Sequence, residues 1–207
     1  MGRYIGPKNK IARRFGVNLW LKTNPTKVAR RLAQKPGVHG TKNMRRNVST
    51  YGKQLLEKQK AKYVYGIREK QLRRYVDEAS RREGDSGTNL QQILETRFDN
   101  VIYRMGYAVT RAQARQFVSH NMFLVNGKKM NIPSHLVKIG DTVELKQNKQ
   151  SKTIFHDISD RLSKQDLPSW LRVDSAKKSG EVTSVPHEKD FDKIFDVKLI
   201  IEYYSSR

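Results

Sequence analysis

The chain has 207 residues, of which 36% are hydrophobic and 30% charged, and its 42 lysines and arginines outnumber 20 acidic residues to give a formal net charge of +22. It contains no cysteine, which excludes a disulfide framework, a thiolate zinc site and a cysteine nucleophile. No apolar run approaches the roughly 18 residues of a membrane span, and the basic start is not followed by the apolar stretch of a secretory signal. We expect one domain or two small ones, with an anionic partner.

The positive charge is concentrated in the first part of the chain. Residues 1–75 hold 21 lysines and arginines against only Glu57 and Glu69, a net charge of +19, whereas residues 76–207 carry a net charge of +3. A segment with so few internal ion pairs needs an external polyanion, and nucleic acid binding gains free energy from counterion release. A solubilising surface and an anionic membrane are the alternatives, but the segment lacks the apolar stripe of a membrane-surface helix.

The first half of the chain is predicted to be an arm followed by helices. Residues 1–48 are rich in glycine and proline and poor in apolar residues, so we expect an irregular arm. A helix is expected from Ser49 to Tyr65, and a second one has the helical spacing of Leu72, Tyr75, Val76 and Ala79 on its apolar face. The composition of segment 83–87 then predicts a loop.

Residues 88–146 give the clearest structural signals. A helix is expected to begin at Thr88 with a capping box and to continue to Met105 along one apolar stripe, and Thr110 begins another in the same way. Asn126-Gly127 between short apolar runs predicts a tight hairpin, and the alternation in residues 142–146 predicts a further strand. These helices are expected to present four arginines to a phosphate backbone: Arg97, Arg104, Arg111 and Arg115.

The remaining chain is less informative. Residues 147–165 and 174–193 are mostly polar, whereas Trp170 is expected to be buried within an ordered segment. Residues 197–204, rich in β-branched and aromatic side chains, predict a strand by composition.

Two sets of motifs resemble known families. LETRFDNVIYRMG at 94–106, TRAQARQFVSH at 110–120 and VNGKK at 125–129 resemble the alpha-L RNA-binding module. GRYIGPK near the start, PGVHG at 36–40, YGKQLLEKQK at 51–60, PSWL at 168–171 and IEYYS at 201–205 resemble the bacterial-type family of small-subunit ribosomal protein four. The chain departs from that family at Val38, where a glutamine is usual, in a longer stretch between His39 and Ser49, and in lacking the cysteines with which many relatives bind zinc.

The resemblance implies an α+β fold with a mostly helical first domain, an extended basic arm and an inserted alpha-L domain of helices on a small antiparallel sheet. The expected boundaries are 1–48 for the arm, 49–93 with 168–207 for the helical domain, and 94–167 for the alpha-L domain.

The resemblance also implies a structural constituent of the small ribosomal subunit, without enzymatic activity or cofactor, on cytoplasmic or organellar ribosomes. Such proteins bind the 5′ domain of 16S-type rRNA early, at a multi-helix junction. Further partners would be mRNA near its entry path and neighbouring proteins, with ribosomal protein five near Glu202. The expected RNA-binding residues are Arg3, Tyr4, Lys8, Arg13, Arg14, Lys42, Arg45, Arg46, Lys53, Gln54, Lys58, Lys60, Arg73, Arg74, Arg111, Arg115, Ser119, His120, Asn126, Lys128 and Lys129.

Other interpretations stay open at this point. Arg111 and Arg115 could lie on an ordinary solvated helix face, and Lys128 and Lys129 could be ordinary turn lysines. Asp99 could be a catalytic acid, as in pseudouridine synthases that carry an alpha-L anchor, although an ion pair with Arg97 fits better. An RNA chaperone or a rescue factor is the third alternative. The five histidines show no metal-ligand spacing.

Overall fold

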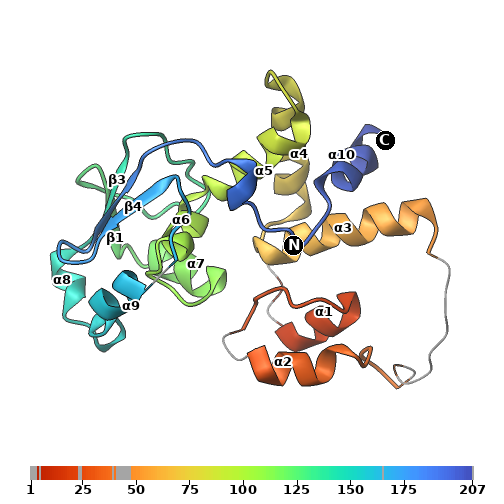
Figure 1. Ribbon diagram of the computed structural model, residues 1–207, viewed down its shortest axis with the longest axis horizontal. Helices are drawn as coiled ribbons and strands as arrows, with labels where there is room; N and C mark the ends of the chain where they lie inside the picture. The colour runs from red at the N-terminus through yellow and green to blue at the C-terminus, as the bar shows by residue number, and fades with distance from the viewer. Residues whose placement is uncertain are drawn as a thin grey trace. The chain divides into compact units, whose positions relative to one another are not determined.

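The computed structural model describes residues 4, 6–22, 25–38, 40, 48–164 and 166–206. The chain divides into two compact units, the first made of Met1–Leu90 with Asp192–Arg207 and the second of Gln91–Phe191 (Figure 1). Helix α5 (Ser86–Glu95) carries the chain from the first unit into the second. No described helix is both long and apolar enough to cross a lipid bilayer. The combination of helices with a small antiparallel sheet confirms the α+β class.

The first unit is helical, including much of the expected irregular arm. Its helices, besides the start of α5, are α1 (Lys8–Phe15), α2 (Pro25–Leu32), α3 (Thr50–Val64), α4 (Glu69–Arg81) and α10 (Val197–Ser205). The expectation of an irregular chain was wrong for α1 and α2, because Ile11, Ala12, Leu19 and Val28 are all buried and supply a small apolar contact between them. The expected helices at 49–65 and 72–79 are confirmed, with Ser49 accepting a hydrogen bond from the Gly52 N–H as the N-cap of α3.

The C-terminal segment is a helix, so the prediction of a strand there was wrong. The Asp196 side chain accepts a hydrogen bond from the Lys198 N–H at 2.9 Å and caps α10. Val197, Ile200 and Tyr203 are buried and lie three residues apart, which is a helical spacing, and α10 packs on α3. Burial of this stripe outweighs the β propensity of the individual residues.

The long helix expected from Thr88 is two helices, α5 and α6 (Phe98–Arg104). It begins two residues earlier than expected, because Asp85 accepts hydrogen bonds from both the N–H and the hydroxyl of Thr88. The break follows from a distant segment: the Phe98 N–H donates to the His135 carbonyl at 2.8 Å, and the Val137 N–H donates to the Thr96 carbonyl at 3.0 Å. Arg97 therefore has extended backbone between the two helices.

The second unit is a five-stranded antiparallel sheet covered by helices. The strands lie in the order β2-β1-β3-β5-β4 and are β1 (Phe123–Val125), β2 (Lys128–Lys129), β3 (Thr142–Leu145), β4 (Leu171–Asp174) and β5 (Ser179–Val182). The other elements are α6, α7 (Arg111–Ser119), α8 (Gln147–Gln150), the short 3-10 helices at Thr153–Phe155 and Glu188–Asp190, and α9 (Ile158–Lys164). Figure 1 shows α6 and α7 together on one side of the sheet.

Several sequence expectations are confirmed in this unit. Thr110 accepts a hydrogen bond from the Gln113 N–H and caps α7. Asn126 and Gly127 both have positive φ in the β1–β2 turn, as a two-residue hairpin requires. Trp170 is completely buried in the core between helices and sheet.

The mostly polar residues 147–165 still contribute to the core, because Phe155, Ile158 and Leu162 enter it from the 3-10 helix and α9. One domain boundary in the later part of this unit differs from the expected one. Residues 168–191 were assigned to the helical domain, whereas β5 pairs with β3 and β4 pairs with β5, so this segment completes the sheet.

Candidate nucleic-acid interface

Two buried carboxylates organise the arginines of α6 and α7. Asp99 accepts hydrogen bonds from Arg97 Nε at 3.1 Å and Nη2 at 2.8 Å, and also from Arg115 Nη1 at 3.1 Å. Glu95, fully buried at the end of α5, is bound by Arg104 through two hydrogen bonds of 2.9 and 2.8 Å. The predicted Arg97–Asp99 ion pair is thus confirmed.

The burial of two arginines corrects one expectation. Arg97 is only 1% exposed and the side chain of Arg104 only 17%, so neither presents its charge to solvent as expected from the sequence. Their guanidinium groups are used inside the protein to neutralise Asp99 and Glu95. A buried carboxylate without such a partner is strongly unfavourable, which explains why these arginines point inward.

Arg111 and Arg115 remain partly exposed and are held in fixed positions. Arg111 Nε donates to Asn100 Oδ1 at 2.8 Å, and its guanidinium carbon lies 4.6 Å from the centre of the Tyr103 ring. Asn100 is itself fixed by hydrogen bonds from its side-chain amide to the carbonyl and carboxylate of Glu95. Arg115 is bound to Asp99, with 32% of its side chain exposed. Cations held in this way lose little conformational entropy when they bind a phosphate.

The end of α7 and the β1–β2 turn contribute further polar groups. Ser119 and His120 are exposed, as are Lys128 and Lys129 in the turn. Asn126 is exposed as well and also has a structural role. Its amide nitrogen donates to Asp141 at 2.8 Å, and its amide oxygen accepts from the Thr142 N–H at 2.8 Å, so the side chain fixes the turn.

A group of lysines at the end of β3 and in α8 was not predicted from the sequence. The Lys146 N–H donates a hydrogen bond to the Met122 carbonyl, Lys149 lies in α8, and Lys152 is exposed just after α8. In the described part of the chain, no carboxylate forms an ion pair with any of the three. Desolvation together with the positive charges of Lys129 and Lys149 lowers the pKa of Lys146.

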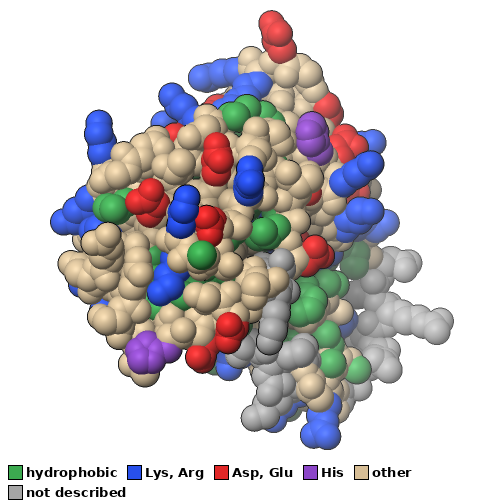
Figure 2. All heavy atoms as spheres, turned by 60° about the vertical axis from the view of Figure 1, so that its left-hand side comes forward, with side chains coloured by type: hydrophobic (Ala, Val, Ile, Leu, Met, Phe, Trp, Pro, Cys, Tyr) green, Lys and Arg blue, Asp and Glu red, His purple; other side chains and the backbone are tan. Residues whose placement is uncertain are grey.

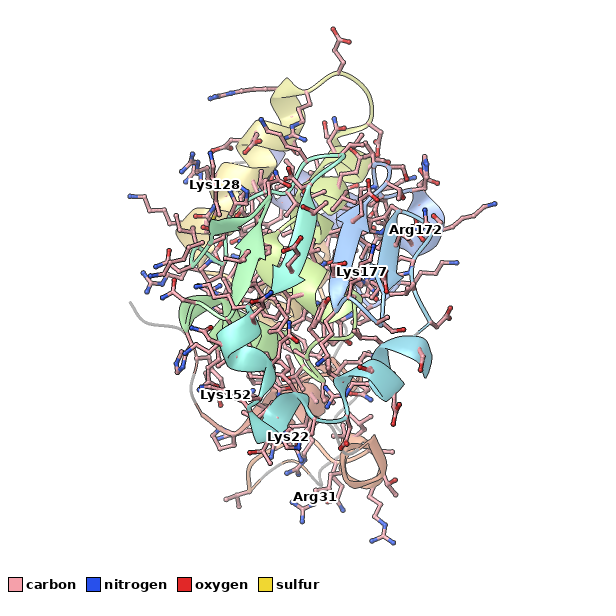
Figure 3. The ribbon with its side chains drawn as sticks, turned by 90° about the vertical axis from the view of Figure 1, so that its left-hand side faces the viewer. Lys22, Arg31, Lys128, Lys152, Arg172 and Lys177 are labelled. Carbon is pink, nitrogen blue, oxygen red and sulfur yellow. The ribbon has the colours of Figure 1, made fainter. Side chains whose placement is uncertain are left out.

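The outer face of the sheet carries both signs of charge. In the strand register, Leu124 of β1 lies opposite Lys129 of β2 and Glu144 of β3, and Glu181 of β5 lies opposite Arg172 of β4. Figure 2 shows acidic and basic side chains interspersed where the second unit faces the viewer. Figure 3 shows the sheet face on, with Lys128 and Lys152 on one side and Arg172 and Lys177 toward the β4 edge. A mixed surface of this kind is unsuited to a polyphosphate, so the candidate interface is limited to α7, the β1–β2 turn and the Lys146–Lys152 segment, which together we call the α7 surface.

In the first unit the expected residues other than Lys58 and Lys60 divide into three groups. Arg14, Lys53, Arg73 and Arg74 are exposed, and so is Tyr4, whose hydroxyl donates to the Pro7 carbonyl at 3.4 Å. Lys8 and Arg13 lie in α1, with Arg13 donating to the carbonyls of Gln34 and Lys35, and Gln54 donates to Glu202 at 3.2 Å. Arg3, Lys42, Arg45 and Arg46 lie outside the described residues.

Lys58 does not face solvent, so its assignment to RNA binding was wrong for this structure. It is 4% exposed, donates to Glu69 at 2.7 Å and lies 4.3 Å from the centre of the Tyr203 ring. The Tyr204 hydroxyl also donates to Glu69 at 2.7 Å. Burial would raise the pKa of Glu69, but the hydrogen bonds from Lys58 and Tyr204 outweigh it and the pKa is lowered. Lys60 is similarly paired with Glu57 at 2.6 Å.

The described residues contain no group of histidine, aspartate and glutamate side chains able to hold a metal ion. The one carboxylate considered as a catalytic acid, Asp99, is occupied by two arginines. The arrangement is one of fixed cations on a folded surface, which suits the binding of phosphates.

Comparison with known proteins agrees with this chemistry. The family model described as "Ribosomal protein S4/S9 N-terminal domain" matches residues 3–95, and the model described as "S4 domain" matches residues 96–143. A relative from Chloroflexus aurantiacus, named small ribosomal subunit protein uS4, is 44% identical over 207 residues, covering 99% of this chain and 100% of the relative. Proteins with the same name from Roseiflexus sp. (45% identical) and Polaromonas naphthalenivorans (44%) each match over 99% of this chain and 100% of their own length.

Proposed function

Because this chain belongs to the uS4 family of small ribosomal subunit proteins, we propose that it binds the 5′ domain of 16S-type rRNA early and organises its folding for later proteins. The observation that carries the proposal is the pair Arg111 and Arg115, fixed on α7 by Asn100 and Asp99 with their guanidinium groups partly exposed. Arginine can contact a phosphate through two hydrogen bonds, and a rigid pair can match the phosphate spacing of a folded RNA.

The mechanism is shape matching combined with charge neutralisation. A-form RNA hides its base edges in a deep groove, so a protein recognises it mainly through phosphates, 2′-hydroxyl groups and overall shape. The α7 surface supplies fixed cations for this purpose. The first unit, with no acidic residue before Glu57, supplies a large number of further cations. If about ten of them contact phosphates, the logarithm of the binding constant should fall with the logarithm of salt concentration with a slope of roughly −7 to −9.

Within this proposal the expected RNA-binding residues contribute in different ways. Most exposed members of the set act on RNA directly, whereas the exposed Asn126 acts by fixing the turn and the buried Lys58 by fixing the helical unit. The stretch containing Lys42, Arg45 and Arg46 is the proposed contact with mRNA near its entry path. The Glu202 region, where Gln54 is bound, is the proposed contact with ribosomal protein five.

The binding test compares two double variants of equal charge. Arg111→Ala with Arg115→Ala should weaken binding to a 5′-domain rRNA fragment by about 1–3 kcal/mol, taking each as a charge-assisted contact. The control pair, Arg172→Ala with Lys177→Ala, removes the same charge from the β4–β5 edge and should leave affinity nearly unchanged. Equal effects of the two variants would refute a specific role of α7. Urea unfolding of each variant separates loss of binding from loss of fold.

Two further experiments address the competing functions. A uridine isomerisation assay on rRNA should show no turnover, because a modifying enzyme would need a catalytic carboxylate, and Asp99 is held by two arginines. Sucrose-gradient fractionation should find the protein in every small subunit at a stoichiometric level, whereas a chaperone or rescue factor would be present transiently.

A further inference from the structure

Trp20 is an exposed tryptophan in an unusual backbone conformation. It lies in the connection between α1 and α2, the residue is 54% exposed, and its φ is 51°. Bulky residues with a Cβ atom rarely adopt positive φ, because the side chain approaches the following carbonyl. The other tryptophan, Trp170, is completely buried, as is usual for so large an apolar side chain. The exposure of Trp20 therefore calls for a binding partner.

Local contacts hold the ring outward. The Trp20 N–H donates to the Asn18 side-chain oxygen at 3.0 Å, which stabilises the turn. The preceding residue, Leu19, is 1% exposed and anchors the segment to the small core of α1 and α2. Because Leu19 is buried, the left-handed backbone at Trp20 directs the Trp20 side chain to solvent. The indole is thus presented by a defined turn in the part of the chain that is richest in positive charge.

The charges around Trp20 define what can cover it. No aspartate or glutamate occurs before Glu57, and Lys22 and Arg14 are exposed close to Trp20 in sequence. Arg31 on α2 is exposed as well, and Figure 3 labels both Arg31 and Lys22. An occupant must offer a flat apolar surface to the indole and negative charge to the cations. An unpaired nucleotide does both, with its base and its phosphates.

We propose that Trp20 stacks on an unpaired base of the rRNA, while exposed cations such as Lys22 contact the adjoining phosphates. The inference rests on the proposed rRNA binding and adds to it a class of ligand, a single-stranded nucleotide, at a site separate from the α7 surface. Stacking on an aromatic ring accepts any base, so this contact fixes the N-terminal segment on RNA without reading its sequence.

The two tryptophans allow a direct test on the unmodified chain. Trp20 is accessible to the neutral quencher acrylamide and Trp170 is not, so the accessible fraction of the fluorescence reports on Trp20. Binding of a 5′-domain rRNA fragment should abolish this accessible fraction and quench the Trp20 emission. In filter binding, Trp20→Leu should weaken affinity about tenfold, whereas Trp20→Phe keeps an aromatic face and should stay within about threefold. Ile139→Ala, a truncation of an exposed apolar residue in the second unit, should have no effect.

The results separate failure of this inference from failure of the proposed function. Tight, salt-dependent rRNA binding with unchanged acrylamide accessibility, and equal affinities of Trp20→Leu and wild type, would refute stacking and leave rRNA binding intact. Protection of Trp20 only after other small-subunit proteins are added would equally refute it, because the indole would then be a protein contact. Absence of rRNA binding by the wild-type chain would overturn both.

Discussion

Replacement of Asp99 by alanine tests the buried network on which the α7 surface depends. Asp99 is 4% exposed and accepts two hydrogen bonds from Arg97, which is 1% exposed and would be left charged without its carboxylate partner. Removing one partner of a buried pair costs about 3–5 kcal/mol. The partly exposed contact with Arg115 adds at most about 1 kcal/mol, and loss of an acidic group from the first turn of α6 adds a few tenths. We therefore expect Asp99→Ala to lower the free energy of unfolding by about 4 kcal/mol.

The stability of Asp99→Ala is measured by urea unfolding, monitored by circular dichroism, together with two comparison variants. Glu78→Ala breaks the exposed Glu78–Arg82 pair and should cost no more than about 0.5 kcal/mol. Arg97→Met combined with Asp99→Leu removes both buried charges at once and should recover most of the loss caused by Asp99→Ala. A loss below about 1 kcal/mol for Asp99→Ala, or a double variant as unstable as the sum of its parts, would refute the account of this network.

Three more predictions concern other parts of the molecule. The pKa of Glu69 is lowered in the folded chain, so the ionised carboxylate stabilises the fold above the ordinary pKa of 4.5, and this stabilisation is lost as the pH falls through the lowered pKa. Glu69→Gln should therefore flatten the acid limb of a plot of unfolding free energy against pH, and an unchanged limb would contradict this. Lys146→Gln with Lys149→Gln should make the salt slope of rRNA binding shallower by about 1–2, whereas the corresponding glutamine changes at the β4–β5 control positions should leave it unchanged. Asn126→Ala should cost about 1–3 kcal/mol in urea unfolding, because it removes the hydrogen bonds that fix the turn and places alanine at positive φ; a loss under about 0.5 kcal/mol would oppose that role.

The sequence predicts those features whose causes are local. The Asn126-Gly127 turn and the Thr110 cap each depend on residues within a few positions, and both are confirmed. The apolar stripe of α4 is likewise evident from the helical spacing of its residues alone. The same applies to the helix α7 itself, since Arg111 and Arg115 lie four residues apart and must share one face of it, whereas the Lys146–Lys152 part of the α7 surface was not predicted.

Features that depend on distant segments could not be predicted from the sequence. The break before α6 is made by carbonyls of residues 133–135, and nothing near Arg97 signals it. Lys58 is buried because Glu69 comes from the next helix and Tyr203 from the far end of the chain. For α10 two local signals disagreed: the composition favoured a strand, whereas the spacing of Val197, Ile200 and Tyr203 favoured a helix.

The placement of α10 against α3 has a consequence for biosynthesis. The Asp196 N–H donates to Glu57, and Tyr204 donates to Glu69, so the first unit is closed by residues that are translated after the second unit. Residues 91–191, in contrast, are all synthesised before α10. A nascent chain can thus complete its sheet-containing unit while its earlier helices still lack their final partner. The unit that starts first on the ribosome would be the one that matures second.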